Sequence, residues 1–513
     1  MRSRCNSPTC LFYCFSMTPG TFSMRNKHAP GRRSSSLKMA SLAPLALLAH
    51  PALASEQVHT VDPAITWLFT GILLAMVACL AFEEKLHAQK SLITGLFALL
   101  SLLIATALEL LPFGPVINVF NESLHLPVYI PGIDWEVIAI IVGASLFVDV
   151  TSKSGLFSYL AIRLTKASKG DPRKLLIYYG CMTVLFSALL NNVTAMIIIG
   201  SLTSVSLAKL NQSKLLLGFL LTEGLLTNIG GLLTLISSVP NIILGNIAGI
   251  TFLDFFLFAA PFVVISTWAT LRLAARVFQI EPLTAEADKN RAEALVAGFD
   301  ESEGIPSAAF FKVSIVLFAL LILTFSLQSV LPLLSELGMG FVALLFAFIA
   351  LIRFRHDVDE FYRGIDWDLI FFFITLFMLI NVMEHAQVLA LIGTGIVSLL
   401  ELGATASSLA LLWSSAIASS VTDNIPLAAM LGKILASMGL PSDSLLWWSV
   451  IFGANLGGNI TPIGSASTVV AVTLMHKANI KLSFSGFVAK AFLFAVLQLL
   501  LASLYLYLIA TLF

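Results

Sequence analysis

Residues Ser419 to Gly432 read Ser-Ser-Val-Thr-Asp-Asn-Ile-Pro-Leu-Ala-Ala-Met-Leu-Gly, which places the carboxylate of Asp423 inside a long apolar run. A charge at membrane depth is costly and normally marks an ion or proton pathway. A related stretch occurs earlier in the chain, since a shift of 232 positions aligns Asp423-Asn424 with Asn191-Asn192. The chain therefore contains two related polar sites, each surrounded by apolar sequence.

Two further matches indicate that the whole chain is an internal duplication. The same shift aligns Gly-Ile-Asp-Trp-Asp at 364–368 with Gly-Ile-Asp-Trp-Glu at 132–136. A shift of 227 aligns Ala-Asn-Leu-Gly-Gly at 454–458 with Thr-Asn-Ile-Gly-Gly at 227–231, and it also aligns Thr461 with Thr234. Duplicated halves that are interrupted by polar, glycine-rich stretches are typical of secondary transporters.

The composition bounds the class of protein. Of 513 residues, 58% are hydrophobic and only 11% are charged, which indicates a polytopic membrane protein in contact with the lipid bilayer. The formal net charge is zero, so the sequence suggests no nucleic-acid partner. The cysteines show no disulfide or metal-ligand spacing, and no phosphate-binding loop is present. We therefore expect no cofactor, no structural metal and no enzymatic activity.

Residues 1–54 have the pattern of a signal or targeting segment. The segment lacks Asp and Glu, contains several arginines, and ends in a short apolar stretch before Ala54. We expect cleavage after Ala54 and a multi-pass protein of the bacterial inner membrane. An organellar transit peptide is the alternative, since such peptides are also rich in Arg and Ser.

The duplication divides the rest of the chain. We expect N-terminal transmembrane helices at 55–131, transport repeat 1 at 132–280, a soluble cytoplasmic linker at 281–307, connecting transmembrane helices at 308–363, and transport repeat 2 at 364–513. Segments 175–208 and 405–438 are too long for one span of about 20 residues and too short for two. Each is predicted to be a re-entrant hairpin with its polar tip at mid-depth, where protein or a water-filled cavity must cover the backbone.

Basic residues predict the orientation of the two repeats. The loop before the first hairpin is strongly basic, whereas the loop before the second hairpin, 399–405, carries only Glu401. By the positive-inside rule the two hairpins enter from opposite sides. The sequence thus predicts an all-α polytopic membrane protein with two inverted-topology repeats, each with a re-entrant hairpin and a broken transmembrane helix.

The polar residues of the hairpin tips and helix breaks are the candidate ion ligands. Amide, hydroxyl and carboxylate oxygens suit small cations, and Gly230-Gly231, Gly457-Gly458 and Pro462 permit unwinding of the second motif pair. The candidates are Asn191, Asn192, Thr194, Thr227, Asn228, Thr234, Asn241, Asp423, Asn424, Asn455, Asn459 and Thr461. Candidates for proton coupling are Asp423, Glu223 and Asp149, with a structural ion pair near Lys153 as the alternative for Asp149.

The four motifs at 191–195, 227–231, 423–426 and 457–464 resemble the ion transporter superfamily, in the branch of arsenite permeases, NhaD-type sodium/proton antiporters and the P protein. The resemblance runs from about Ile133 to the C-terminus. It implies inverted repeats, a homodimer and an elevator motion. Many relatives carry Asp where this chain has Asn191, so only one tip carboxylate, Asp423, is expected here.

Two functions follow from these residues. The first is a sodium (or lithium):proton antiporter that works by alternating access, in which one carboxylate binds either a proton or the transported cation. The alternative is a permease for an oxyanion or carboxylate (arsenite, silicate, citrate) that binds at helix ends. An anion carrier would be expected to have an arginine within the membrane near the motifs. The sequence shows none there, which favours a cation as the substrate.

The hairpin makes a direct prediction about topology. Single cysteines at Lys169 and Lys214, in a background without native cysteines, should both react only with reagent on the cytoplasmic side, because a hairpin returns to the side from which it enters. Labelling of intact and opened cells with a membrane-impermeant maleimide measures this. Reaction of the two positions from opposite sides would exclude the hairpin.

Overall fold

The structure is a computed structural model that describes residues 61–117, 121–302 and 304–512. The predicted signal segment, 1–54, lies outside the described residues. Ten described helices are long and apolar enough to cross a membrane. The expectation of an all-α polytopic membrane protein is thus confirmed, while the inverted orientation of the repeats stays a prediction.

The first half begins with helices that lead into the first hairpin and the first broken helix. Its helices are α1 (Pro63–Ala81), α2 (Glu83–Leu86), α3 (Lys90–Ala107), α4 (Trp135–Ser152), α5 (Leu156–Ala167), α6 (Pro172–Leu189), α7 (Asn192–Lys209), η1 (Ser213–Leu215), α8 (Leu216–Gly230), α9 (Val239–Ala248) and α10 (Phe252–Val277). Two short strands, β1 (Val116–Ile117) and β2 (Ser123–Leu124), pair in antiparallel fashion between α3 and α4.

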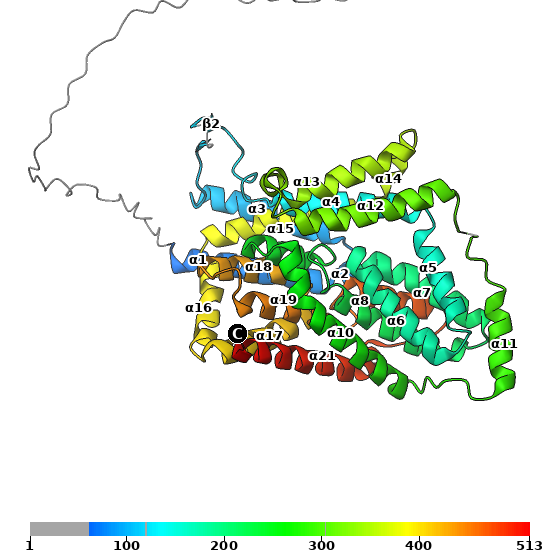
Figure 1. The fold of residues 1–513 in the computed structure, drawn as a ribbon. Coiled ribbons are helices and arrows are strands. Elements are labelled where there is room, and N and C mark those ends of the chain that lie inside the picture. The colour runs from blue at the N-terminus through cyan, green and yellow to red at the C-terminus, as the bar shows by residue number, and fades with distance from the viewer. Residues whose placement is uncertain (1–60, 118–120, 303, 513) are drawn as a thin grey trace, which may run out of the picture. The chain divides into compact units, whose positions relative to one another are not determined.

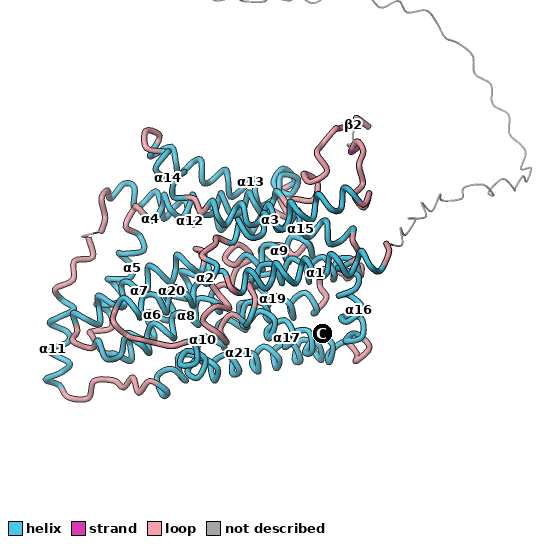
Figure 2. The backbone as a smooth tube through the Cα atoms, turned by 180° about the vertical axis from the view of Figure 1, so that it is seen from behind, coloured by secondary structure: helices cyan, strands magenta, loops and turns pink. Residues whose placement is uncertain are grey.

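The second half repeats this order after the linker. Its helices are α11 (Glu286–Ala297), α12 (Ala308–Leu327), α13 (Pro332–Leu351), η2 (Ile352–Phe354), α14 (Val358–Gly364), α15 (Trp367–His385), α16 (Val388–Leu400), α17 (Ala404–Val421), α18 (Asn424–Ser437), α19 (Leu445–Gly457), α20 (Ala466–Lys477) and α21 (Phe484–Leu512). Helices α3, α4, α12, α13 and α15 form one layer over the hairpins and broken helices (Figures 1 and 2).

Both predicted hairpins are present as pairs of helices. Segment 175–208 contains α6 and α7, and segment 405–438 contains α17 and α18, each pair being interrupted at the polar tip. Both predicted helix breaks are also present, since residues 231–238 separate α8 from α9 and residues 458–465 separate α19 from α20. Pro462 lies inside the second break, where no regular helix has to continue.

Two glycines let each hairpin approach its broken helix closely. A Cβ atom on Gly230 would lie 2.6 Å from the carbonyl oxygen of Val184, and one on Gly457 would lie 2.3 Å from that of Ala416. Each glycine ends the first part of its broken helix and packs on the backbone of the first hairpin helix. Only hydrogen leaves room for this contact, which fixes the distance between α8 and α6 and between α19 and α17.

Acidic residues of the 132–136 and 364–368 motifs connect helices within the layer that covers the hairpins and broken helices. The backbone N–H of Met339 in α13 donates to Glu136 Oε1 at 2.8 Å, next to Gly338, whose φ of +76° kinks α13. The backbone N–H of Ser91 in α3 donates to Asp368 Oδ1 at 3.2 Å. Helices α3 and α13, which lie outside the predicted repeats, therefore occupy equivalent places against the two copies of one motif.

The linker contains a helix that the sequence did not predict. Helix α11 lies at the basic end of the first hairpin, where Lys169 Nζ is 3.1 Å from Glu293 Oε1 and Lys166 Nζ is 3.2 Å from Glu301 Oε1. The pairs are at least one-third exposed, so each contributes about 1 kcal/mol at most. These ion pairs show that the acidic linker packs against the basic loop that precedes the first hairpin.

The two tight glycines predict a matched pair of stability effects. Gly457→Val and Gly230→Val should each lower the free energy of unfolding by about 1–3 kcal/mol, because the added atoms meet backbone that cannot move aside. Thermal unfolding in detergent, followed by tryptophan fluorescence, measures the loss. Gly395→Ala in α16 is the control, since nothing lies within 4 Å of a Cβ there. Equal melting temperatures for all three variants would contradict a tight backbone contact at Gly230 and Gly457.

Candidate functional site

Two hydrogen bonds attach the first hairpin to the first broken helix. Ser187 Oγ donates to the carbonyl oxygen of Thr227 at 2.6 Å, and Thr234 Oγ1 donates to the carbonyl oxygen of Ala188 at 2.6 Å. The carbonyl group of Ala188 lies in the last turn of α6, and that of Thr227, which also accepts from the backbone N–H of Gly231 at 2.8 Å, lies in the last turn of α8. The hydroxyl groups satisfy backbone oxygens that water does not reach.

The second hairpin is attached in the same way. Ser419 Oγ donates to the carbonyl oxygen of Ala454, and Thr461 Oγ1 donates to that of Ser420, both at 2.6 Å. The sequence shifts of 232 and 227 that align the motifs also superimpose these partners on those of the first half. The duplication seen in the sequence is thus also a duplication of tertiary hydrogen bonds.

The two helix breaks are joined by reciprocal bonds. Ser465 Oγ donates to Asn228 Oδ1 at 2.9 Å, and Ser238 Oγ donates to Asn455 Oδ1 at 2.7 Å. Asn228 and Asn455 are equivalent residues of the two repeats, as are Ser238 and Ser465. Each break therefore uses the other repeat to satisfy its buried asparagine.

Further amide bonds extend this network. Asn228 Nδ2 donates to Asn459 Oδ1 at 2.8 Å, and Asn455 Nδ2 donates to Asn241 Oδ1 at 2.9 Å. Asn192 Nδ2 lies 3.3 Å from Asn228 Oδ1 and links the first tip to the network. Five predicted ligands are thus brought together, but four of them, all except Asn192, are buried and already bonded within the protein.

The tip residues act first as helix caps. Asn191 Oδ1 accepts from the backbone N–H of Thr194 at 2.7 Å at the start of α7. Asp423 Oδ1 accepts from the backbone N–H of Ile425 at 3.0 Å at the start of α18. Asn and Asp are favoured at this position because their side-chain oxygen binds a free N–H of the first turn. The cap explains why the hairpin helices restart at the tip.

A cavity of about 340 Å³ lies between α4, both tips and both breaks. It is lined by the predicted residues Asn191, Asn192, Thr194, Asn424 and Asp149. The other predicted residues do not line it. Seven of them belong to the hydrogen bonds that hold the breaks and tips: Thr227, Asn228, Thr234, Asn241, Asn455, Asn459 and Thr461. Asp423 borders the cavity, since the next residue, Asn424, lines it, whereas Glu223 lies elsewhere.

Four helices begin at this cavity. Residues at the N-termini of α7, α9, α18 and α20 all line it. Each helix N-terminus carries a partial positive charge equivalent to about half an elementary charge. For α9 and α20, the side chains of the capping serines Ser238 and Ser465 accept no hydrogen bond from a backbone N–H of their own helix. Their hydroxyl groups bind the asparagines of the opposite repeat instead, so the first turns of α9 and α20 have no side-chain cap.

Two carboxylates oppose these helix ends. Asp149 of α4 and Asp366, which precedes α15, both line the cavity and are both exposed to it. Lys153, the neighbour suggested for Asp149, instead forms an ion pair with Glu360. Among the described residues, no lysine or arginine lines the cavity. Asp366 was missed as a site residue, although its place in the duplicated 364–368 motif was a signal.

Lys90 is the second residue that the sequence did not reveal. Its Nζ lies 2.5 Å from Asp423 Oδ2, and the side chain of Asp423 is only 14% exposed. Lys90 begins α3, far from the second hairpin in the sequence. The contact joins residues more than 300 positions apart, so only the fold brings this cation to the tip carboxylate.

Glu223 is placed away from the cavity. It is buried in α8, and its Oε1 accepts from Thr203 Oγ1 at 2.6 Å, while its Oε2 has no partner among the described residues. A wholly buried carboxyl group with one hydrogen bond is costly to ionise. Glu223 therefore remains a candidate for proton coupling without contact to the cavity.

Comparison with known proteins agrees with this architecture. The "uncharacterized transporter Rv2684" of Mycobacterium tuberculosis is 33% identical over 390 residues, covering 74% of this chain and 86% of the relative. The human P protein is 25% identical over 529 residues, which cover 88% of this chain and 60% of that protein. The crystal structure of the Alcanivorax borkumensis YdaH transporter covers 82% of this chain and 98% of its own, with a TM-score of 0.52 at 13% identity.

The likeness to YdaH concerns the fold alone, since the identity is low. The sequence itself shows the family, because the model of the CitMHS family, described as citrate transporters, matches residues 77–452. This range includes both hairpins, the first broken helix and most of the cavity lining. The chain is therefore a multi-pass membrane transporter that belongs to the CitMHS citrate transporter family of the ion transporter superfamily.

Proposed function

We propose that this transporter exchanges sodium or lithium for protons by alternating access. The observation that carries the proposal is the cavity between the tips, which has two carboxylates, Asp149 and Asp366, and no basic lining residue in the described chain. Carboxylate, amide and hydroxyl oxygens are the donors that small hard cations prefer. Asn191, Asn192 and Thr194 supply the neutral donors of this lining.

Asp423 would couple the two fluxes. Its Oδ2 binds the Lys90 ammonium, so a positive charge already balances this carboxylate. A proton on Asp423 or a metal cation beside it would each take the place of Lys90. Because one carboxylate holds only one of these partners at a time, cation and proton binding exclude each other, and exclusive binding is the requirement for antiport.

Lys90 would act as a tethered competitor for the transported cation. Without a bound ion or proton, its ammonium keeps the partly buried carboxylate of Asp423 compensated, which avoids the cost of an unpaired charge. An incoming sodium ion must displace it, and the released Lys90 would remain close to Glu83, whose Oε1 is 3.9 Å away. The apparent sodium affinity would thus depend on the strength of the Lys90–Asp423 pair.

A carboxylate or oxyanion permease is the second candidate. It is favoured by the four helix N-termini at the cavity, which attract anions, and by the description of the family as citrate transporters. A substrate carboxylate would bind the backbone N–H groups at the starts of α9 and α20. The two cavity carboxylates then require a co-transported cation or proton for charge balance, so this candidate predicts cation-dependent uptake.

The Asp423→Asn variant tests the antiporter. The change is nearly isosteric and makes the second tip resemble the first, so the protein should insert normally but lose sodium-dependent proton movement to the level of protein-free liposomes. Reconstituted protein with a trapped pH dye measures the exchange across sodium, lithium, potassium, citrate and arsenite. Asp443→Asn, at an exposed loop position, is the control and should retain exchange.

The outcomes separate the candidates. Wild-type exchange in folded Asp423→Asn protein would contradict coupling at Asp423 and transfer it to Asp149 or Glu223. Citrate or arsenite uptake by wild-type protein, without sodium-driven proton movement, would favour the permease.

Lys90→Gln tests the tethered competitor. Removal of the ammonium should lower the sodium concentration for half-maximal exchange about fivefold, if the partly exposed pair contributes about 1 kcal/mol. Lys289→Gln removes an exposed pair in the linker helix, outside the cavity, and should leave this value unchanged. An increased half-maximal sodium concentration in Lys90→Gln would show that Lys90 assists cation binding, contrary to the proposal. The double variant Lys90→Gln/Asp423→Asn should behave like Asp423→Asn alone.

A further inference from the structure

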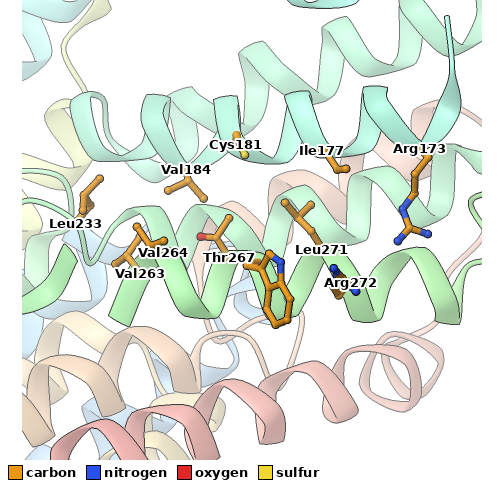
Figure 3. Close-up of a pocket in the computed structure, with 11 residues that line it drawn as sticks. Arg173, Ile177, Cys181, Val184, Leu233, Val263, Val264, Thr267, Leu271 and Arg272 are labelled. Atoms are coloured by element: carbon orange, nitrogen blue, oxygen red, sulfur yellow. The ribbon is translucent and has the colours of Figure 1, made fainter. Parts of the chain in front are cut away.

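A second, larger cavity of about 650 Å³ lies between the first hairpin and α10, away from the ion site. Figure 3 shows α6 and α10 along its two sides, with Arg173 and Arg272 at one end and Val184 and Leu233 at the other. From Arg173 to Val184 the groove follows about 16 Å of α6, at the helical rise of 1.5 Å per residue. We call it the α6/α10 groove.

The groove has a basic end. Arg173 lies in the first turn of α6, and Arg272 lies in the later part of α10. Neither guanidinium forms an ion pair with any described residue, although Arg272 stacks over the ring of Trp268 at 4.8 Å. Two unpaired arginines facing one cleft suit a phosphate group, which accepts several hydrogen bonds from guanidinium donors.

The rest of the groove is apolar and open to the outside of the helix bundle. Trp268 is 60% exposed, Val264 67% and Ile177 41%. In a membrane protein such side chains face lipid tails. A ligand that extends from the arginines along this wall must therefore be amphipathic, with an anionic head and a hydrocarbon tail.

One buried hydroxyl lies between the basic end and the apolar end. Thr267 lines the groove and is only 8% exposed, yet its Oγ1 has no hydrogen-bond partner in the described structure. Buried hydroxyl groups normally have a partner, so an unpaired one in a cavity calls for a ligand atom. An ester carbonyl oxygen would accept this hydrogen bond.

We propose that the α6/α10 groove binds one anionic phospholipid. Arg173 and Arg272 hold the phosphate, Thr267 donates to an ester carbonyl of the glycerol backbone, and one acyl chain lies along the groove toward Val184 and Leu233. The basic residues around the groove place the headgroup in the cytoplasmic leaflet, where anionic lipids attract lysine and arginine.

The inner end of the groove connects the lipid to the transport machinery. Leu233 belongs to the first helix break, and its backbone N–H donates to the carbonyl oxygen of Gly230 at 2.9 Å. Val184 belongs to the turn of α6 that packs against Gly230. A bound acyl chain would therefore contact both sides of the joint between the hairpin and the broken helix, whatever ion the protein carries.

Lipid binding to the purified full-length protein tests the proposal. Delipidated protein in detergent is titrated with phosphatidylglycerol or phosphatidylcholine, and native mass spectrometry counts the bound lipids. Wild type should prefer phosphatidylglycerol, and Arg173→Gln/Arg272→Gln should lose that preference by about tenfold. Lys174→Gln, an exposed neighbour outside the groove, is the control and should keep it.

Thr267→Val provides the second variant. It should weaken binding of both lipids about fivefold without changing their ratio, because it removes one hydrogen bond and no charge. Equal binding of both lipids by wild type would overturn the proposal. So would full competition by glycerol phosphate, which would mean a site for free phosphate, or cross-linking of two copies through Cys181, which would mean a protein interface.

Discussion

Unwound backbone at membrane depth needs a hydrogen-bond partner, and this requirement shapes the whole transport core. Each hairpin tip and each helix break interrupts the ladder of backbone hydrogen bonds within a membrane protein, where lipid tails offer no partner. The chain meets the requirement with short hydroxyl and amide side chains. Ser187 and Thr234 bind the first half, and Ser419 and Thr461 bind the second half in the same way. These four side chains therefore have a structural role that does not depend on transport.

The reciprocal Ser–Asn bonds add a second consequence, since the buried asparagine of each repeat accepts a hydrogen bond from a serine of the other repeat. Asn228 depends on Ser465, and Asn455 depends on Ser238. A buried amide without its partner would cost about 1–3 kcal/mol. The two breaks therefore stay together, and their second helices, α9 and α20, both begin at one cavity. The cavity is a product of this mutual dependence, because it lies where the breaks and tips meet.

The charges around the tips are arranged in opposition. Helix N-termini bring partial positive charge to the cavity, while Asp149 and Asp366 bring negative charge, and Lys90 compensates Asp423 beside it. Such a balance keeps the site close to neutral, which lowers the cost of holding these charges within a membrane. It also makes the site sensitive to one added proton or cation, which is the property that a gradient-driven carrier needs.

The amino-acid sequence alone determined the membrane class, the duplication, both hairpins and both helix breaks. These features depend on local chemistry: apolar runs, Asn and Asp at caps, paired glycines and Pro462 act within a few residues of their own position. The sequence did not determine which polar residues line the cavity and which form hydrogen bonds within the protein. Asn191 and Asn228 are the same residue type in similar polar motifs, yet only Asn191 lines the cavity. Only the tertiary structure decided that Lys90 meets Asp423 and that Asp366 joins Asp149, because these contacts join helices far apart in the chain. It also decided that Glu223 lies away from the cavity, because helix packing, not composition, sets the direction in which a buried side chain points.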